Sequence, residues 1–147
     1  MRGNRIDDTT GGNSGVEPRV AVIYRETVEK RGYSLEKFVD VVSTTPARMF
    51  GLFPRKGAIA VGSDADLILF DPEAKGRITA AAMHMRVDYN PYEGTEVTGR
   101  PRTVLSRGTV LVDEGKFVAP PGHGKMLKRD RYNPKASASR ELVGVVA

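Results

Sequence analysis

Residues 54–72 read Pro-Arg-Lys-Gly-Ala-Ile-Ala-Val-Gly-Ser-Asp-Ala-Asp-Leu-Ile-Leu-Phe-Asp-Pro, and they carry the strongest structural signal in the chain. Gly57 and Gly62 can adopt the positive φ that tight turns require, and Asp64 and Asp66 bracket the next turn. Leu67–Phe70 is a continuous apolar run with the length of a fully buried strand. The stretch therefore predicts a turn, a strand, a second turn and a buried strand, in a compact β-hairpin module.

Three helices are predicted before this stretch. Apolar residues recur at helical spacing over residues 18–31, which indicates a first helix. Ser34 is a capping residue for a second helix. Thr45 is expected to cap a third, short helix, with Pro46 at its first position and Gly51 at its end.

The signals after Gly57 favour β-structure. Arg107-Gly108 and residues 113–115 are typical hairpin turns. From Gly122 onward the composition predicts an extended arm or a disordered end. The expected strands share short β-branched or apolar runs, and they cover residues 67–70, 77–79, 104–106, 110–112 and 116–118, with 83–87 as a further possible strand.

Composition excludes some functions. The formal net charge is +5, but basic and acidic residues are interspersed, which is typical of a solvated surface. The only local basic excess is Lys125, Lys128, Arg129 and Arg131, with Tyr132 as its sole aromatic, so nucleic-acid binding is not expected. No window has the apolar length of a membrane span, no secretory signal is indicated, and cysteine is absent. We expect no membrane partner and a cytoplasmic location.

Several motifs occur in a fixed order along the chain. They are Gly15-Val16-Glu17 with Arg19, residues 38–52, residues 54–72, Asn90-Pro91-Tyr92-Glu93-Gly94, Ser106-Arg107-Gly108 and Pro121-Gly122-His123-Gly124. Together they resemble the dihydropyrimidinase and D-hydantoinase family of the amidohydrolase superfamily. The resemblance covers roughly residues 11–129.

This resemblance implies a fold that the chain can hold only in part. The family is built on a metal-dependent (β/α)₈ barrel, which needs about 250 residues, whereas the chain has 147. We therefore expect an α+β fragment from the C-terminal portion of such a protein. Its expected parts are a loop remnant (1–16), the last helices of the TIM barrel (17–56), a small β-sandwich-type domain (57–121) and an extended C-terminal tail (122–147).

The resemblance also implies where the chemistry resides. Family members hold a pair of divalent metals, typically zinc, with four histidines, a carboxylated lysine and an aspartate, all upstream of the motifs matched here. His84 and His123 are the only histidines, and we interpret both as structural. Asp7 and Asp8 do not align with the metal aspartate. No catalytic residue, metal ligand or cofactor is therefore assigned within this chain.

One feature of the family's substrate site falls within the chain. Family members commonly read Asn-Gly-x-x-Gly-[Val/Ile]-Glu in a substrate-holding loop, and the asparagine position aligns with Gly11 here. Asn13 lies two residues later and is the one candidate substrate-binding residue, although a plain turn role is favoured. Asp64 and Asp66 are interpreted as structural turn residues, and residues 89–92 as a packing or subunit contact.

Three hypotheses follow. The first is a segment of a cyclic amidohydrolase that hydrolyses C–N bonds in dihydropyrimidines or hydantoins and is inactive alone. The second is a non-catalytic oligomerisation or protein-interaction module, which self-associates or binds a complementary amidohydrolase barrel chain. Phe38, Val42 and Phe50 are the apolar helix residues expected to be exposed for such a partner. The third is a truncated gene product without a function of its own.

Overall fold

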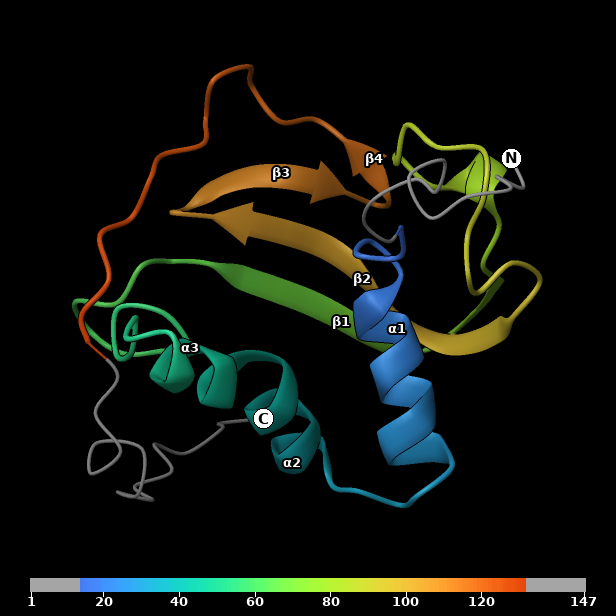
Figure 1. Cartoon of the computed structure of the whole chain (residues 1–147), viewed down its shortest axis with the longest axis horizontal. Coiled ribbons are helices and arrows are strands. Elements are labelled where there is room, and N and C mark those ends of the chain that lie inside the picture. Colours follow the sequence, from blue (N-terminus) through green and yellow to red (C-terminus); the bar gives the residue numbers. More distant parts are fainter. Residues whose placement is uncertain (1–13, 132–147) are drawn as a thin grey trace, which may run out of the picture.

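The computed structural model describes residues 14–131. A layer of helices lies on one side of a four-stranded antiparallel sheet in the order β1-β2-β3-β4 (Figure 1). The expectation of an α+β fragment is confirmed for these residues. The helices are α1 (Arg19–Tyr24), α2 (Leu35–Val39) and α3 (Thr45–Met49), with π-helical turns η2 (Arg25–Glu29) and η3 (Asp40–Thr44) extending α1 and α2.

The helix boundaries follow local capping signals, with one exception. Ser34 caps α2, because its hydroxyl accepts a hydrogen bond from the Lys37 N–H at 3.3 Å. Gly51 has a φ of +66° just beyond α3, as a helix-ending glycine should. The predicted cap at Thr45 is wrong, because η3 runs directly into α3 and Thr45 is helical. Its hydroxyl donates instead to Asp40 Oδ1 at 2.9 Å.

The sheet consists of β1 (Leu67–Arg77), β2 (Glu96–Ser106), β3 (Thr109–Asp113) and β4 (Lys116–Phe117). Both predicted hairpin turns are confirmed. In the β2–β3 turn, Arg107 and Gly108 have φ values of +47° and +78°, which suit the right-handed twist of the strands they connect. β1 contains the predicted strand at 67–70 but ends at Arg77, the first residue of the predicted strand at 77–79, and its pairing with β2 contains two register shifts.

Two expected strands are absent from the described residues. Residues 58 and 59 are irregular and residues 60 and 61 form a bend and a turn, and the preceding Gly57 carbonyl accepts a hydrogen bond from the Thr44 hydroxyl at 2.9 Å. This contact holds the segment against the helical layer. Residues 83–87 follow the 3₁₀ turn η4 (Ala80–Ala82) as an irregular loop. There the His84 N–H is bonded to the Glu17 carboxylate rather than to a neighbouring strand.

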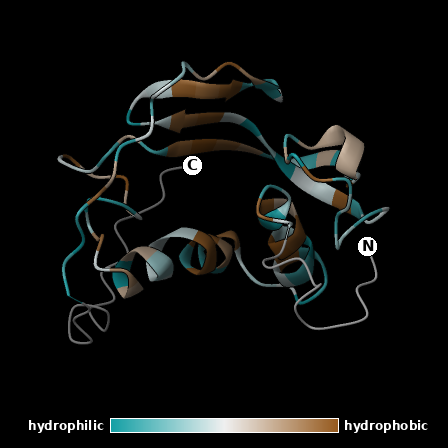
Figure 2. Cartoon of the chain, turned by 45° about the horizontal axis from the view of Figure 1, so that its top comes forward, coloured by the Kyte–Doolittle hydropathy of each residue, from teal (hydrophilic) through white to brown (hydrophobic). Residues whose placement is uncertain are grey.

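The core between the layers is small and aromatic. The ring centroids of Tyr24, Phe38 and Phe70 lie 4.9 to 5.7 Å apart, which joins α1, α2 and β1. Figure 2 shows hydrophobic stretches on the long strands above hydrophobic stretches on the helices. Phe38 is only 5% exposed, so the expectation of an exposed Phe38 is wrong: its ring completes this cluster.

Large apolar side chains remain exposed outside this core. Ile68 and Leu69 are 49% and 54% exposed, so residues 67–70 are not the fully buried strand that the sequence predicted. Successive side chains of a strand point to opposite faces, so neither face of the sheet is fully covered at these two residues. Phe50 is 58% exposed, as expected, whereas Val42 is half-buried.

The segment after β4 runs back along the molecule toward the helices (Figure 1). It is fixed at two described points. His123 contacts the β2–β3 hairpin, and the Asp130 N–H donates to the Gly51 carbonyl at 3.1 Å, beside the end of α3. None of the helices within residues 14–131 has the length and apolar character needed to cross a bilayer.

Candidate functional site

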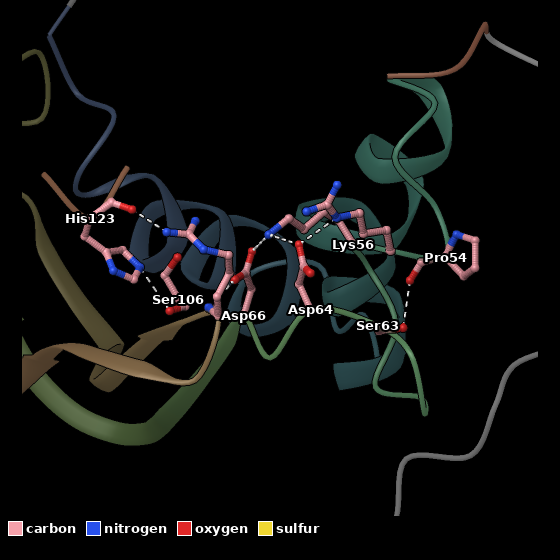
Figure 3. A network of polar contacts seen from close by, with 9 residues as sticks. Pro54, Lys56, Ser63, Asp64, Asp66, Ser106 and His123 are labelled. Atoms are coloured by element: carbon pink, nitrogen blue, oxygen red, sulfur yellow. Dashed lines mark hydrogen bonds and ion pairs between the residues drawn. The ribbon is translucent and has the colours of Figure 1, made fainter. Parts of the chain in front are cut away.

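A network of charged groups occupies the connection between α3 and β1 (Figure 3). Lys56 lies at its centre, with a side chain only 16% exposed. Its Nζ lies 2.9 Å from Asp64 Oδ2 and also contacts Asp66 Oδ2. Arg55 Nε donates to Asp64 Oδ2 at 3.0 Å. The turn that precedes β1 is therefore held by two carboxylates and two cations.

The network extends from this turn to the β2–β3 hairpin and to the segment after β4. Asp66 Oδ1 accepts a hydrogen bond from the Arg107 N–H at 2.8 Å, and the Arg107 guanidinium donates to the His123 carbonyl. The His123 Nε2–H donates to the Ser106 carbonyl at 3.1 Å. One continuous set of contacts thus joins three segments that are distant in sequence (Figure 3).

The network favours the charged forms of Lys56, Asp64 and Asp66. The hydrogen bond from Lys56 lowers the pKa of Asp64. Burial disfavours the Asp66 anion, but hydrogen bonds from Lys56 and from the Arg107 N–H outweigh burial and lower the pKa of Asp66. Burial likewise disfavours the Lys56 cation, and its two carboxylate partners nevertheless raise the pKa of Lys56. A carboxylate held in its anionic form by fixed cations is a poor general acid.

This arrangement suits a structural role. Asp66 bonds a backbone N–H, as a structural turn residue should, whereas Asp64 bonds the Arg55 and Lys56 side chains. We therefore keep the structural interpretation of both aspartates. The sequence assigned Arg107 to a hairpin turn, but no local pattern indicated its contact with Asp66, which lies 41 residues away, and Lys56 was assigned no role.

A second polar cluster joins the start of α1 to the loop at 83–92. Glu17 Oε1 accepts from the His84 Nδ1–H at 2.7 Å, and Glu17 Oε2 accepts from the His84 N–H at 2.7 Å. The Ser14 hydroxyl donates to the Tyr89 carbonyl at 3.1 Å. These contacts agree with the structural interpretation of His84, but no pattern in the sequence indicated Glu17 as its partner.

The described residues do not fit the metal centre that the resemblance implies. His84 and His123 belong to separate contact sets, one with Glu17 and the other with Ser106. Within residues 14–131, no three His, Cys, Asp or Glu side chains gather into a group that could hold a metal ion. We therefore assign no metal-dependent step to these residues.

The candidate substrate-binding residue, Asn13, lies outside the described residues, as does Gly11, with which the family asparagine aligns. The first described residue of that segment is Ser14. The basic group at 125–131 is exposed, and its aromatic neighbour Tyr132 also lies outside the described range. The assignment of Asn13 remains a prediction.

Comparison with known proteins identifies the family. The model of the Amidohydrolase family matches residues 6–111, well over half of the chain. The chain belongs to the amidohydrolase family.

Individual relatives of this amidohydrolase chain are more specific. A D-hydantoinase from Ralstonia pickettii is 54% identical over 121 residues, which is 82% of this chain and 26% of the relative. A D-hydantoinase from Geobacillus stearothermophilus is 50% identical over 130 residues, 87% of this chain and 28% of the relative. A dihydropyrimidinase from Rattus norvegicus is 42% identical over 129 residues, 86% of this chain and 25% of the relative.

Solved structures agree with these matches. One D-hydantoinase structure has 53% sequence identity and a TM-score of 0.76, over 80% of this chain and 26% of its own. An L-hydantoinase from Arthrobacter aurescens has 33% identity and a TM-score of 0.62, over 72% of this chain and 23% of its own. The resemblance read from the motifs is confirmed, and the amidohydrolase chain spans about a quarter of the length of these relatives.

Proposed function

We propose that this chain is the C-terminal portion of a cyclic amidohydrolase that opens dihydropyrimidine or hydantoin rings. The observation that carries the proposal is an identity of 42–54% to named hydantoinases and a dihydropyrimidinase, over 82–87% of this chain. Residues 17–56 would supply the last barrel helices, residues 57–121 the small β-sandwich-type domain, and residues 122–147 the tail. The proposed reaction is reversible hydrolysis of a cyclic amide C–N bond to an N-carbamoyl amino acid.

The proposed contribution of the chain is structural rather than catalytic. The residues described between 14 and 131 offer no donor set for the metals, which are typically zinc in the resembled family. We place the metal ligands in the portion of the relatives that has no counterpart here. Because the nucleophile and the Lewis acid belong to that portion, this chain alone should not turn over substrate.

The proposed partner is a complementary amidohydrolase barrel segment, in the same or a separate polypeptide. Exposed apolar side chains on both layers support this proposal, because a partner could cover them. They belong to Met49 and Phe50 at the end of α3 and to Ile68 and Leu69 in β1. The outer edge of β1 adds further support. Within the described sheet no strand pairs with that edge, although β1 is eleven residues long.

Co-expression with part of a relative tests this proposal. The D-hydantoinase from Ralstonia pickettii would be produced without the segment that matches this chain, either alone or together with this chain, in the presence of Zn²⁺. We expect ring opening of hydantoin or dihydrouracil only from the pair. The control replaces this chain with the relative's own excised segment.

The relative's own excised segment shows whether a failure to restore turnover is specific to this chain. If the relative's own segment restores turnover and this chain does not, the proposed function is wrong. If this chain opens the rings by itself and binds zinc stoichiometrically, its proposed non-catalytic role is wrong.

A second candidate function is a non-catalytic interaction module that binds copies of itself. The same exposed apolar residues favour it, since they can be covered by a second copy as well as by a barrel. Stable self-association without restored turnover in the co-expression experiment would favour this second function.

A further inference from the structure

The chain that enters α1 is attached to the loop at 83–92 by side-chain contacts between residues far apart in sequence. The Glu17 carboxylate holds His84 through both of its oxygens, each at 2.7 Å. The Gly15 N–H donates to Met85 Sδ at 3.4 Å, and the Ser14 hydroxyl donates to the Tyr89 carbonyl. Each of these contacts joins residues 67 to 75 positions apart.

The geometry at Glu17 assigns the proton on His84. A carboxylate is only an acceptor, so the contact at 2.7 Å requires hydrogen on His84 Nδ1. The second oxygen accepts from the main-chain N–H of the same residue. The two bonds therefore fix both the position of the loop backbone and the orientation of the imidazole.

Both sides of this contact are anchored to the rest of the fold. Glu17 precedes Pro18, which is buried, and the start of α1. On the other side, Glu93 Oε2 accepts from the Ala80 N–H at 2.7 Å, and the Gly94 N–H donates to the Ile78 carbonyl at 2.8 Å. The His84 ring also lies 6.1 Å from the Phe117 ring in β4. The contact between Glu17 and His84 thus connects the start of α1 to the loop at 83–92, and each of these segments has further contacts with the rest of the fold.

We propose that Glu17 and His84 form a latch that sets the position of residues 14–17 relative to the loop at 83–92 and to β4. They are positioning residues, because they act on the path of the chain into α1 and touch no reacting group. Loss of the contact between Glu17 and His84 frees residues 14–17, while Tyr24 stays packed in the aromatic core. This inference goes beyond the proposed function and does not depend on it.

Three substitutions separate the elements of the latch. His84→Phe removes the Nδ1 donor and keeps a ring beside Phe117. His84→Asn keeps an N–H donor near the position of Nδ1 and removes the ring. Glu17→Ala removes both acceptors. His123→Asn changes the other histidine of the chain, which lies outside the latch, and serves as the control.

Amide hydrogen exchange of the whole chain measures the latch directly. We expect exchange at Gly15 and His84 to accelerate about tenfold in Glu17→Ala and at Gly15 in His84→Phe, as for the loss of a charge-assisted hydrogen bond. In His84→Asn and His123→Asn, exchange at Gly15 should stay near the wild-type rate. Unchanged exchange at Gly15 in both Glu17→Ala and His84→Phe would overturn the latch.

Nitrogen NMR of the unmodified chain gives a second test that does not depend on the folding of any variant. Under conditions in which imidazole is neutral, the wild-type His84 ring should carry its hydrogen on Nδ1. Hydrogen on Nε2 instead would contradict the assigned contact and the proposal with it. Neither readout involves turnover, so these results are independent of the co-expression experiment.

Discussion

At the scale of single residues, Gly99 illustrates how closely the core depends on one position. It lies in β2 with a φ of +83°, between the rings of Tyr24 and Phe70. A Cβ placed on it would come within 2.6 Å of Phe70 Cζ and 2.7 Å of Tyr24 Cδ1. Both the backbone conformation and the space therefore require glycine.

Gly99→Ala should lower the free energy of unfolding by about 3 kcal/mol, through overpacking and the left-handed backbone conformation. Gly76→Ala is the matched control in β1, because its Cβ would meet nothing within 4 Å and its φ is not in the left-handed region. Urea denaturation of both variants measures the difference. Equal stabilities for the two variants would contradict the packing described for Tyr24 and Phe70.

Single-residue features could be predicted where their signal is local. Gly57 and Gly62 have φ values of +78° and +90°, and the turn pattern around them had indicated this. The need for glycine at position 99 was not predicted, because it arises from Tyr24, which lies 75 positions earlier and packs on it only in the folded chain. The partnership of Glu17 and His84 was missed for the same reason.

At the scale of elements, the Lys56 network connects the helices, the β2–β3 hairpin and the segment after β4. The pKa values of Asp64 and Asp66 lie below the ordinary value of 3.8 in the folded chain. Such groups stabilise the fold above the ordinary pKa, and this contribution is lost as the pH falls through the lowered folded pKa. The network should therefore contribute fully at neutral pH and weaken in acid.

Lys56→Met should destabilise the chain most at neutral pH, since it leaves two neighbouring carboxylates without their shared cation. The difference from wild type should shrink as the pH falls below 3.8, where the carboxylates become protonated. Lys75→Met is the control, because Lys75 is exposed and is not among the residues of the Lys56 network. Urea midpoints at neutral and acidic pH provide the measurement. A constant difference at every pH would mean that charge pairing is not the cause.

The elements themselves were predictable to the extent that short-range signals define them. Ser34 and Gly51 mark helix ends through local hydrogen bonding and backbone conformation, and both predictions are confirmed. Thr45 has the same capping chemistry but lies inside a continuous helical segment. Residues 58–61 have strand propensity, but a contact between Thr44 and Gly57 holds them beside the helices, and propensity alone cannot indicate such a contact.

At the scale of the whole molecule, the chain has a small core and a large exposed apolar surface. Five hydrophobic residues are buried within the described range: Ala21, Tyr24, Phe38, Ala47 and Ile78. Ile68, Leu69 and Phe50 are about half exposed or more. The helical spacing of apolar residues indicated which side chains could be buried, but it could not indicate which of them the rest of the fold would cover.

The isolated chain should self-associate, because exposed apolar surface of this extent favours contact between copies. Sedimentation velocity at micromolar concentration should detect species larger than a monomer. The double substitution Ile68→Thr with Leu69→Thr keeps strand propensity and should shift the distribution toward monomer. Met126→Gln, on the segment after β4, should not. A wild-type chain that sediments as a single monomer would contradict this expectation.

The contact between Gly51 and Asp130 has a consequence for the order of events during synthesis. A Cβ at position 51 would come within 2.2 Å of the Asp130 carbonyl, so the two backbones lie against each other. The ribosome completes α3 long before it adds Asp130. Until then the Gly51 carbonyl has no partner from the segment after β4. The nascent chain can bring Asp130 against Gly51 only after all four strands of the sheet have been synthesised.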